Sequence, residues 1–127
     1  MPVITLITVI NAPIKVVFDL SRSIDLHKIS TAKTNEEAVA GRTSGLINLG
    51  ESVTWRAKHF GITQKLTSSI TAFNYAHSFT DEMTSGAFKS FKHDHIFEET
   101  NHGVLMTDIF DYKSPFGVLG QMADALF

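Results

Sequence analysis

The sequence predicts an α+β fold in which an antiparallel sheet of about seven strands packs against two short helices and a C-terminal helix. Three observations carry this prediction. Residues 3–10 are rich in β-branched side chains, residues 37–113 alternate apolar and polar side chains between recurrent glycines, and residues 119–126 repeat apolar side chains at helical spacing. A chain of 127 residues is long enough to bury a core of its own. We therefore expect one domain over residues 1–127.

The N-terminal part predicts one strand and two short helices. Val3–Ile10 has the β-branched composition of a strand. Pro13 follows it closely and suits the first position of a helix, which apolar side chains at helical spacing predict over Pro13–Arg22. Ser23 is a candidate N-cap for a second short helix. The polar residues 30–35 are expected to connect this helix to the sheet.

Six further strands are expected, separated by glycines at spacings that suit the turns of an antiparallel meander. One face of each is apolar and the other polar, which predicts a sheet covered on one side only. On the third, for example, Leu66, Ser68, Ile70 and Ala72 share a face. The predicted strands are Glu37–Arg42, Glu51–Phe60, Gln64–Phe73, Phe79–Ser85, Phe88–Glu99 and Val104–Lys113.

The last element is predicted as a helix, because Leu119, Met122, Ala123 and Leu126 form one apolar stripe. The stripe stops at Leu126-Phe127 without a glycine cap. We expect the natural helix to continue beyond this point and the chain to be shortened there.

Two histidines on one strand face mark the candidate site. At the side-chain period of a strand, His93 and His95 share a face with Phe91 and Phe97. The next strand, reached through a hairpin turn at residues 100–103, places Met106, Asp108, Phe110 and Tyr112 on one face. If the two aromatic faces coincide, Asp108 lies within reach of both imidazoles.

Three interpretations of this group remain open. The carboxylate could orient an imidazole for proton transfer, which makes His93, His95 and Asp108 candidate catalytic residues. The group could instead be a buried polar network that fixes strand register, the commoner use of such pairs. A metal site with His59 as a further ligand is the least favoured, because residue types without geometry are weak evidence, and no metal is expected. Asp81 shares its strand parity with Met83 and could be a second polar group of the site, but a surface position near a strand end is favoured.

Composition and charge exclude several classes of function. The net charge is −2 and lysines and arginines do not cluster, which argues against nucleic acid and an anionic membrane surface. The absence of cysteine excludes disulfides and thiolate chemistry. No signal peptide and no apolar run of about 20 residues is visible, so we expect no membrane insertion and a cytoplasmic location. No glycine-rich phosphate loop precedes a helix, and no cofactor is expected.

Several local motifs accompany this order of elements: Asn11-Ala12-Pro13 with Val17-Phe18, Phe88 to Phe97, Met106-Thr107-Asp108 with Tyr112, and Pro115 to Gly120. Together they resemble the START-like, Bet v 1-like (SRPBCC) superfamily, in particular its bacterial cyclase/dehydrase-like, ligand-binding branch. The resemblance covers essentially the whole chain. It implies a helix-grip fold, in which a curved sheet grips the long C-terminal helix around a hydrophobic cavity. The superfamily includes lipid carriers, hormone receptors and aromatase/cyclases.

From the residues and the resemblance together we expect a small hydrophobic ligand, such as a lipid, a polyketide-like molecule or an aromatic ring, between the sheet and the C-terminal helix. The first alternative is a cyclase- or dehydratase-type lyase or isomerase that uses His93 or His95 with Asp108. The second is a protein-interaction module, and a homodimer is one partner to test. The residues expected to line the site are Trp55, Leu66, Met83, Phe91, His93, His95, Phe97, Met106, Asp108, Phe110 and Tyr112.

Overall fold

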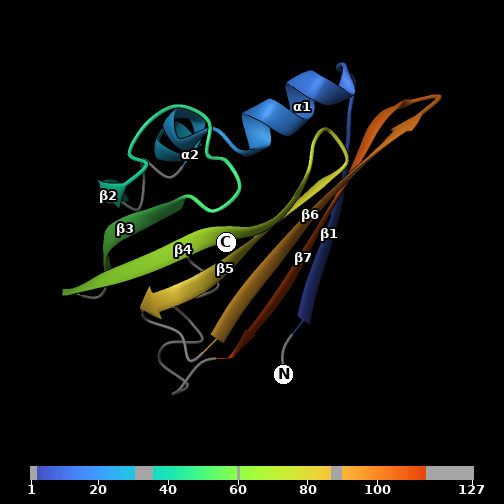
Figure 1. Ribbon diagram of the computed structural model, residues 1–127. Coiled ribbons are helices and arrows are strands. Elements are labelled where there is room, and N and C mark those ends of the chain that lie inside the picture. The colour runs from blue at the N-terminus through green and yellow to red at the C-terminus, as the bar shows by residue number, and fades with distance from the viewer. Residues whose placement is uncertain (1–2, 31–35, 60, 87–89, 114–127) are drawn as a thin grey trace.

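The computed structural model describes residues 3–30, 36–59, 61–86 and 90–113. These residues form one strand, two short helices and six further strands, in the predicted order (Figure 1). The ends of most elements differ from the predicted ends by one or two residues. The elements are β1 (Val3–Ile10), α1 (Ile14–Ser21), α2 (Ile24–Ser30), β2 (Glu37–Gly41), β3 (Ser52–His59), β4 (Ile62–Asn74), β5 (Ser78–Gly86), β6 (Ser90–Thr100) and β7 (Gly103–Lys113).

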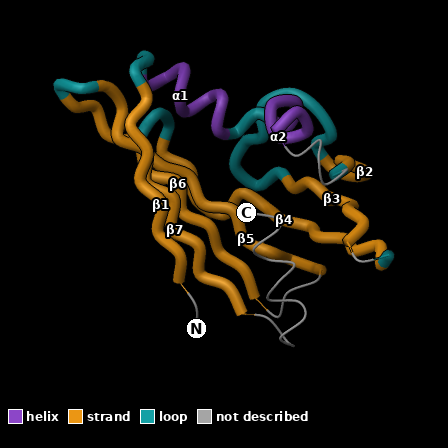
Figure 2. Tube along the Cα trace, turned by 180° about the vertical axis from the view of Figure 1, so that it is seen from behind, coloured by secondary structure: helices purple, strands orange, loops and turns teal. Residues whose placement is uncertain are grey.

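All seven strands belong to one curved antiparallel sheet, with the order β1-β7-β6-β5-β4-β3-β2. The chain leaves β1 at one edge, crosses through α1 and α2 to β2 at the other edge, and then returns strand by strand to β1 (Figures 1 and 2). The last described strand therefore pairs with the first, and Val3 lies opposite Asp111. This closes the meander that the glycine spacing predicts.

The main core lies where α1 packs on the sheet. Phe18 is fully buried, and its ring meets the rings of Phe73, Tyr75, Phe79 and Phe97 edge-on at centroid distances of 5.2–5.4 Å. Such edge-to-face pairs stabilise a core beyond the area they bury. The next helix, α2, begins at the predicted cap, because Ser23 Oγ accepts a hydrogen bond from the Leu26 N–H at 3.1 Å. We call the sheet face that α1 covers the inner face.

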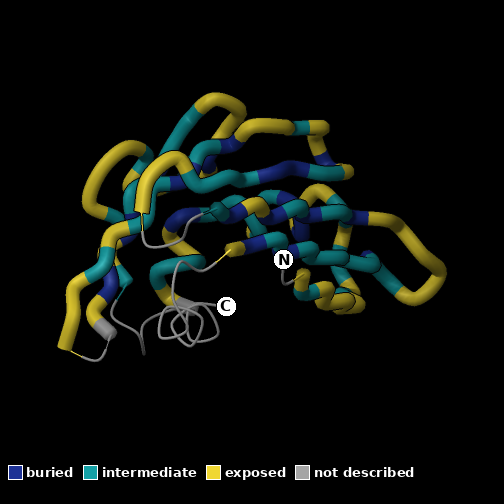
Figure 3. The backbone as a smooth tube through the Cα atoms, turned by 90° about the horizontal axis from the view of Figure 1, so that it is seen from below, coloured by how far each residue is buried: buried dark blue, intermediate teal, exposed yellow. Residues whose placement is uncertain are grey.

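Side chains on the inner face follow the predicted alternation along most strands. Figure 3 shows the buried positions along the middle of the strands and the exposed ones at the turns. The prediction is wrong at Ala72, which is exposed. A β-bulge between Ile70 and Ala72 adds a residue to β4 and reverses the alternation after it. Phe73 consequently turns to the inner face, where it packs against Phe18.

The hairpin between β6 and β7 sets the register at the centre of the sheet. Asn101 and His102 form its two-residue loop, and Thr100 pairs with Gly103. From this turn the register runs back so that His95 lies opposite Asp108. The two aromatic faces predicted from the sequence are therefore the same face.

The predicted C-terminal helix lies within residues 114–127, outside the described residues, as do residues 31–35 of the predicted connection. Among the helices that are described, neither is long and apolar enough to span a bilayer.

Candidate functional site

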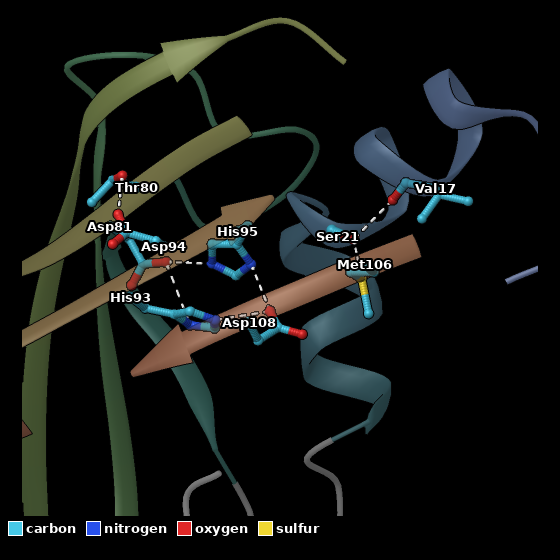
Figure 4. A network of polar contacts seen from close by, with 9 residues as sticks. All are labelled: Val17, Ser21, Thr80, Asp81, His93, Asp94, His95, Met106 and Asp108. Carbon is cyan, nitrogen blue, oxygen red and sulfur yellow. Dashed lines mark hydrogen bonds and ion pairs between the residues drawn. The ribbon is translucent and has the colours of Figure 1, made fainter. Parts of the chain in front are cut away.

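Four ionisable side chains meet on the inner face at the centre of the sheet. Asp81 comes from β5, His93 and His95 from β6, and Asp108 from β7 (Figure 4). Because these three strands are neighbours, alternate residues on each bring the two carboxylates to opposite sides of the imidazole pair. We call these four residues the His–Asp cluster.

The imidazole of His95 lies between both carboxylates. Its Nε2 is 2.8 Å from Asp81 Oδ2, and its Nδ1 is 3.2 Å from Asp108 Oδ1. Each nitrogen can therefore donate a hydrogen bond to a carboxylate oxygen, which only the protonated, charged imidazole can do from both sides. The geometry favours an imidazolium at His95.

The imidazole of His93 has one close carboxylate only. Its Nε2 is 2.9 Å from Asp108 Oδ1, the oxygen that His95 also contacts. Its Nδ1 is 3.9 Å from Asp81 Oδ2, too far for a hydrogen bond. A neutral His93 that donates from Nε2 and keeps a lone pair on Nδ1 satisfies this arrangement.

Aromatic rings hold both imidazoles in place. The rings of Phe79, His95, His93 and Phe110 form a column in which neighbouring centroids lie 4.0, 3.6 and 3.6 Å apart. The column crosses from β5 through β6 to β7. Because each imidazole is packed on two sides, neither ring can turn without disturbing its neighbours.

The protonation of the cluster follows from these contacts. Burial alone would lower the pKa of His95, but the hydrogen bonds to Asp108 and Asp81 outweigh it and raise the pKa to about 8. At His93 burial prevails over the hydrogen bond to Asp108 and lowers the pKa below its ordinary value. Burial would raise the pKa of Asp108, but its hydrogen bonds with His93 and His95 hold that pKa well below the usual range.

Metal coordination is one chemistry that such residues permit. Ligand atoms of Asp81, His93 and His95 all lie within 4.8 Å of one another. However, the two imidazole planes are stacked with an angle of 27° between them. A cation bonded to both rings would lie well outside the plane of at least one, where no lone pair points. As placed, the cluster is better suited to hold protons than a metal ion.

Comparison with solved structures identifies the architecture. The major latex-like protein 151 of Panax ginseng matches with a TM-score of 0.67 and 18% identity, over 98% of this chain and 89% of that chain. TTHA0849 from Thermus thermophilus has a TM-score of 0.72 and 16% identity, over 98% and 86%. Ms6760 from Mycobacterium smegmatis has a TM-score of 0.69 and 17% identity, over 98% and 85%. No protein-family model and no curated protein matches the sequence.

The fold is Bet v 1-like. The curved seven-stranded sheet and the two short helices confirm the helix-grip class that the sequence predicts.

Within this Bet v 1-like fold the predicted lining residues divide into two groups, one on each side of the His–Asp cluster. Phe91, Phe110 and Tyr112 are buried together, with Leu66, Met83 and Ile4 packed around them. Trp55, Phe97 and Met106 belong instead to the main core under α1. Phe97 is only 2% exposed and meets the ring of Phe18. Phe97 therefore packs against the helix.

The prediction that Asp81 is a surface residue is wrong. Its side chain is 19% exposed and contacts His95 in the cluster. A signal was present in the sequence, since Phe79, Asp81 and Met83 alternate along one strand face in the manner of the neighbouring strand. Phe79, which stacks on His95, was also missed as a site residue. The side chain of His59 lies outside the part of the chain that the structure describes.

Proposed function

We propose that this protein binds a small hydrophobic molecule, such as a lipid, a polyketide-like molecule or an aromatic ring, against the inner face of its sheet. The His–Asp cluster fixes the polar group of that molecule. The observation that carries the proposal is the position of the cluster, a buried set of charged groups between two apolar clusters. A few fixed polar groups in apolar surroundings are typical of sites that orient small ligands.

Accessibility supports the same role. The side chains of Asp108 and Asp81 are 15% and 19% exposed, so part of each carboxylate remains open to a partner. The Bet v 1-like fold also suits ligand binding, because the superfamily that the sequence resembles includes lipid carriers and hormone receptors. The rings of Phe91, Phe110 and Tyr112 form a buried apolar cluster beside the His–Asp cluster, with Phe110 packed on the His93 imidazole.

Native mass spectrometry of the protein purified from its own host tests the proposal. We expect a near-stoichiometric adduct that is released on denaturation and identified as a small apolar molecule. A titration with Nile red, a neutral apolar dye, is the companion measurement and should saturate at one dye per chain. An empty protein that also fails to bind Nile red saturably would contradict ligand binding at this face.

Acid–base catalysis of the cyclase or dehydratase type is the second candidate. The observation in its favour is that two stacked imidazoles have opposite pKa shifts, His93 downward and His95 upward. Environments that separate the pKa values of neighbouring groups are typical of acid–base pairs. In this role the lone pair of His93 Nδ1 accepts a proton from carbon next to a carbonyl group, and the bound ketone becomes its enolate.

Deuterium exchange separates the enzyme from the carrier. The probe is 2-tetralone in deuterium oxide, with incorporation at its α-carbon followed by NMR. An enzyme should accelerate exchange, and His93→Asn should abolish the acceleration while 2-tetralone still binds. Exchange at the uncatalysed rate in the presence of bound 2-tetralone would count against the enzymatic role and leave the binding role intact.

A further inference from the structure

The two oxygens of the Asp108 carboxylate differ in their hydrogen bonds to the described residues. Its Oδ1 accepts from both His93 Nε2, at 2.9 Å, and His95 Nδ1, at 3.2 Å. Its Oδ2 makes no hydrogen bond to any described residue, and Figure 4 shows it pointing away from the two imidazoles. An ionised carboxylate oxygen can only accept hydrogen bonds. The group that this oxygen would recognise is therefore a donor.

The net charge of the His–Asp cluster also favours a donor group over an anionic one. Two carboxylates face two imidazoles whose ring centroids are 3.6 Å apart. Two positive charges at that separation repel each other strongly in a buried site, so only one of the rings is charged at neutral pH. Two negative charges and one positive charge leave the cluster with a net charge of −1. The upward pKa shift of His95 and the downward shift of His93 agree with this count.

Within the described part of the sheet the strands place no lysine or arginine on the inner face to balance that charge. Arg22, at the end of α1, lies over the ring of Phe73, but it is already paired with Asp19 at 2.9 Å. The lysines and arginines of the strands alternate to the outer face, where all are exposed: Arg56, Lys58, Lys65, Lys92 and Lys113. An anionic group brought to the cluster would lose its water and meet carboxylates without a compensating partner. Desolvated like charges carry a large energetic cost.

We propose, on the basis of the ligand-binding role above, that the polar end of the ligand is a hydrogen-bond donor that is neutral or positive, namely an alcohol, a phenol or a protonated amine. That group donates to Asp108 Oδ2 while the apolar body packs on the cluster of Phe91, Phe110 and Tyr112. Carboxylates, such as free fatty acids, are excluded. The site thus selects by charge within the class of apolar ligands.

A matched probe series tests this selectivity. The probes are 2-naphthalenemethanol, 2-naphthylmethylamine and 2-naphthoate, which share one ring body and differ in the polar group. Each competes with Nile red at pH 7 and low salt, and dye displacement gives its affinity. We expect the alcohol and the amine to bind at least about tenfold more tightly than the carboxylate, a difference of about 1.4 kcal/mol or more.

Charge-neutralising variants locate the origin of the selectivity. In Asp108→Asn the preference against 2-naphthoate should fall to within about threefold, which corresponds to less than about 1 kcal/mol. Asp81→Asn removes the same charge from the other side of the imidazole pair and serves as the second variant if Asp108→Asn does not fold. Asp94→Asn is the matched control, because Asp94 lies on the same strand as the histidines but bonds Thr80 on the outer face, at 2.6 Å. It should keep the full preference.

Each result decides between the two proposals. If 2-naphthoate binds as tightly as the alcohol or more tightly, donor selectivity is wrong while ligand binding stands. If Asp94→Asn loses the preference as fully as Asp108→Asn, the cluster is not its source and the inference fails. If neither Nile red nor any of the three probes binds, ligand binding itself fails.

Discussion

His93 and His95 are two residues apart on one strand and are equally shielded from solvent, yet they are expected to differ in charge. The difference comes from one distance. Both nitrogens of His95 reach a carboxylate oxygen, whereas Nδ1 of His93 is 3.9 Å from Asp81 Oδ2. At the residue scale, then, the cluster behaves as one proton-holding unit whose members cannot titrate independently.

Histidine NMR gives the direct measurement of this difference. Following the imidazole Cε1–H shifts with pH, we expect the midpoint for His95 near 8 and that for His93 below 6.5, the ordinary histidine value. Coincident midpoints for His93 and His95 at the ordinary value would show that the carboxylates do not distinguish the two rings.

Stability should fall between pH 7 and pH 9 because of His95. The folded state holds this proton more tightly than the unfolded state, since the pKa rises from 6.5 to about 8 on folding. The resulting stabilisation is complete below pH 6.5 and disappears as pH rises through 8. Between pH 7 and pH 9 the loss is about 1 kcal/mol.

Urea unfolding at these two pH values measures the loss. His93→Gln should retain it, and His93→Gln/His95→Gln should remove it. If the double variant shows the same fall, another group causes it.

Asp108 could be placed from the sequence and Asp81 could not, for a physical reason. His95 and Asp108 are linked by a two-residue hairpin, whose length nearly fixes the register of the two strands. Asp81 reaches the cluster through the pairing of β5 with β6, and the residues between these two strands include positions 87–89, outside the described residues. Alternation puts Asp81 on the face of Met83, but only the pairing of β5 with β6, with Asp81 opposite His93, brings it to the imidazoles.

At the scale of elements, the β6–β7 hairpin sets the register that brings His95 opposite Asp108. Gly103 has a φ of +123°, and a Cβ there would lie 2.6 Å from the carbonyl oxygen of Ile10. β7 begins at this glycine, beside the end of β1. The residue must therefore combine an unusual backbone angle with close contact to a neighbouring strand, which only glycine does without strain.

Gly103→Ala should lower the free energy of unfolding by about 2 kcal/mol, because backbone strain and a clash with fixed main chain act together. Gly61→Ala is the matched control. Its φ of +76° is also unfavourable, but nothing lies within 4 Å of the added Cβ. Chemical denaturation of both variants separates the two effects, and equal losses would show that the contact with Ile10 has no cost of its own.

The strands could be predicted because the alternation of their side chains is a local pattern. The bulge in β4 could not be predicted in this way. Residues 66, 68 and 70 keep the inner face, and the extra residue after Ile70 then turns Phe73 inward in place of Ala72. No glycine or proline marks this point in the sequence. The packing of Phe73 against Phe18, a residue more than fifty positions away, favours the bulge, and such a contact is invisible to a local pattern.

Across the whole molecule, the two apolar clusters are expected to have different roles, one in stability and the other in ligand binding. The main core under α1 contains Phe18 and Phe97 and holds the helix to the sheet. The second cluster, around Phe91, lies beyond the His–Asp cluster and is built from side chains of β1, β4, β5, β6 and β7. Stability should therefore depend mainly on the first cluster, and ligand affinity on the second.

One substitution in each cluster tests this division. Phe97→Leu should lower the free energy of unfolding by about 1–2 kcal/mol and leave Nile red affinity unchanged. Phe91→Leu should weaken Nile red binding by about five- to tenfold, because about 1 kcal/mol of ring contact with the dye is lost. Equal effects of the two substitutions on affinity would mean that the dye contacts the main core or that the clusters are not separate.

The contact between His27 and Trp55 gives the protein a built-in optical reporter. Trp55 is the only tryptophan, and the imidazole of His27 on α2 lies over its ring at a centroid distance of 4.2 Å. The two rings are tilted by 44° to each other. An imidazole in contact with an indole ring quenches its fluorescence, so the emission of Trp55 records whether α2 is packed on β3. His27→Gln should brighten the folded protein. In the wild type, brightening before the loss of sheet circular dichroism would reveal detachment of α2 ahead of global unfolding.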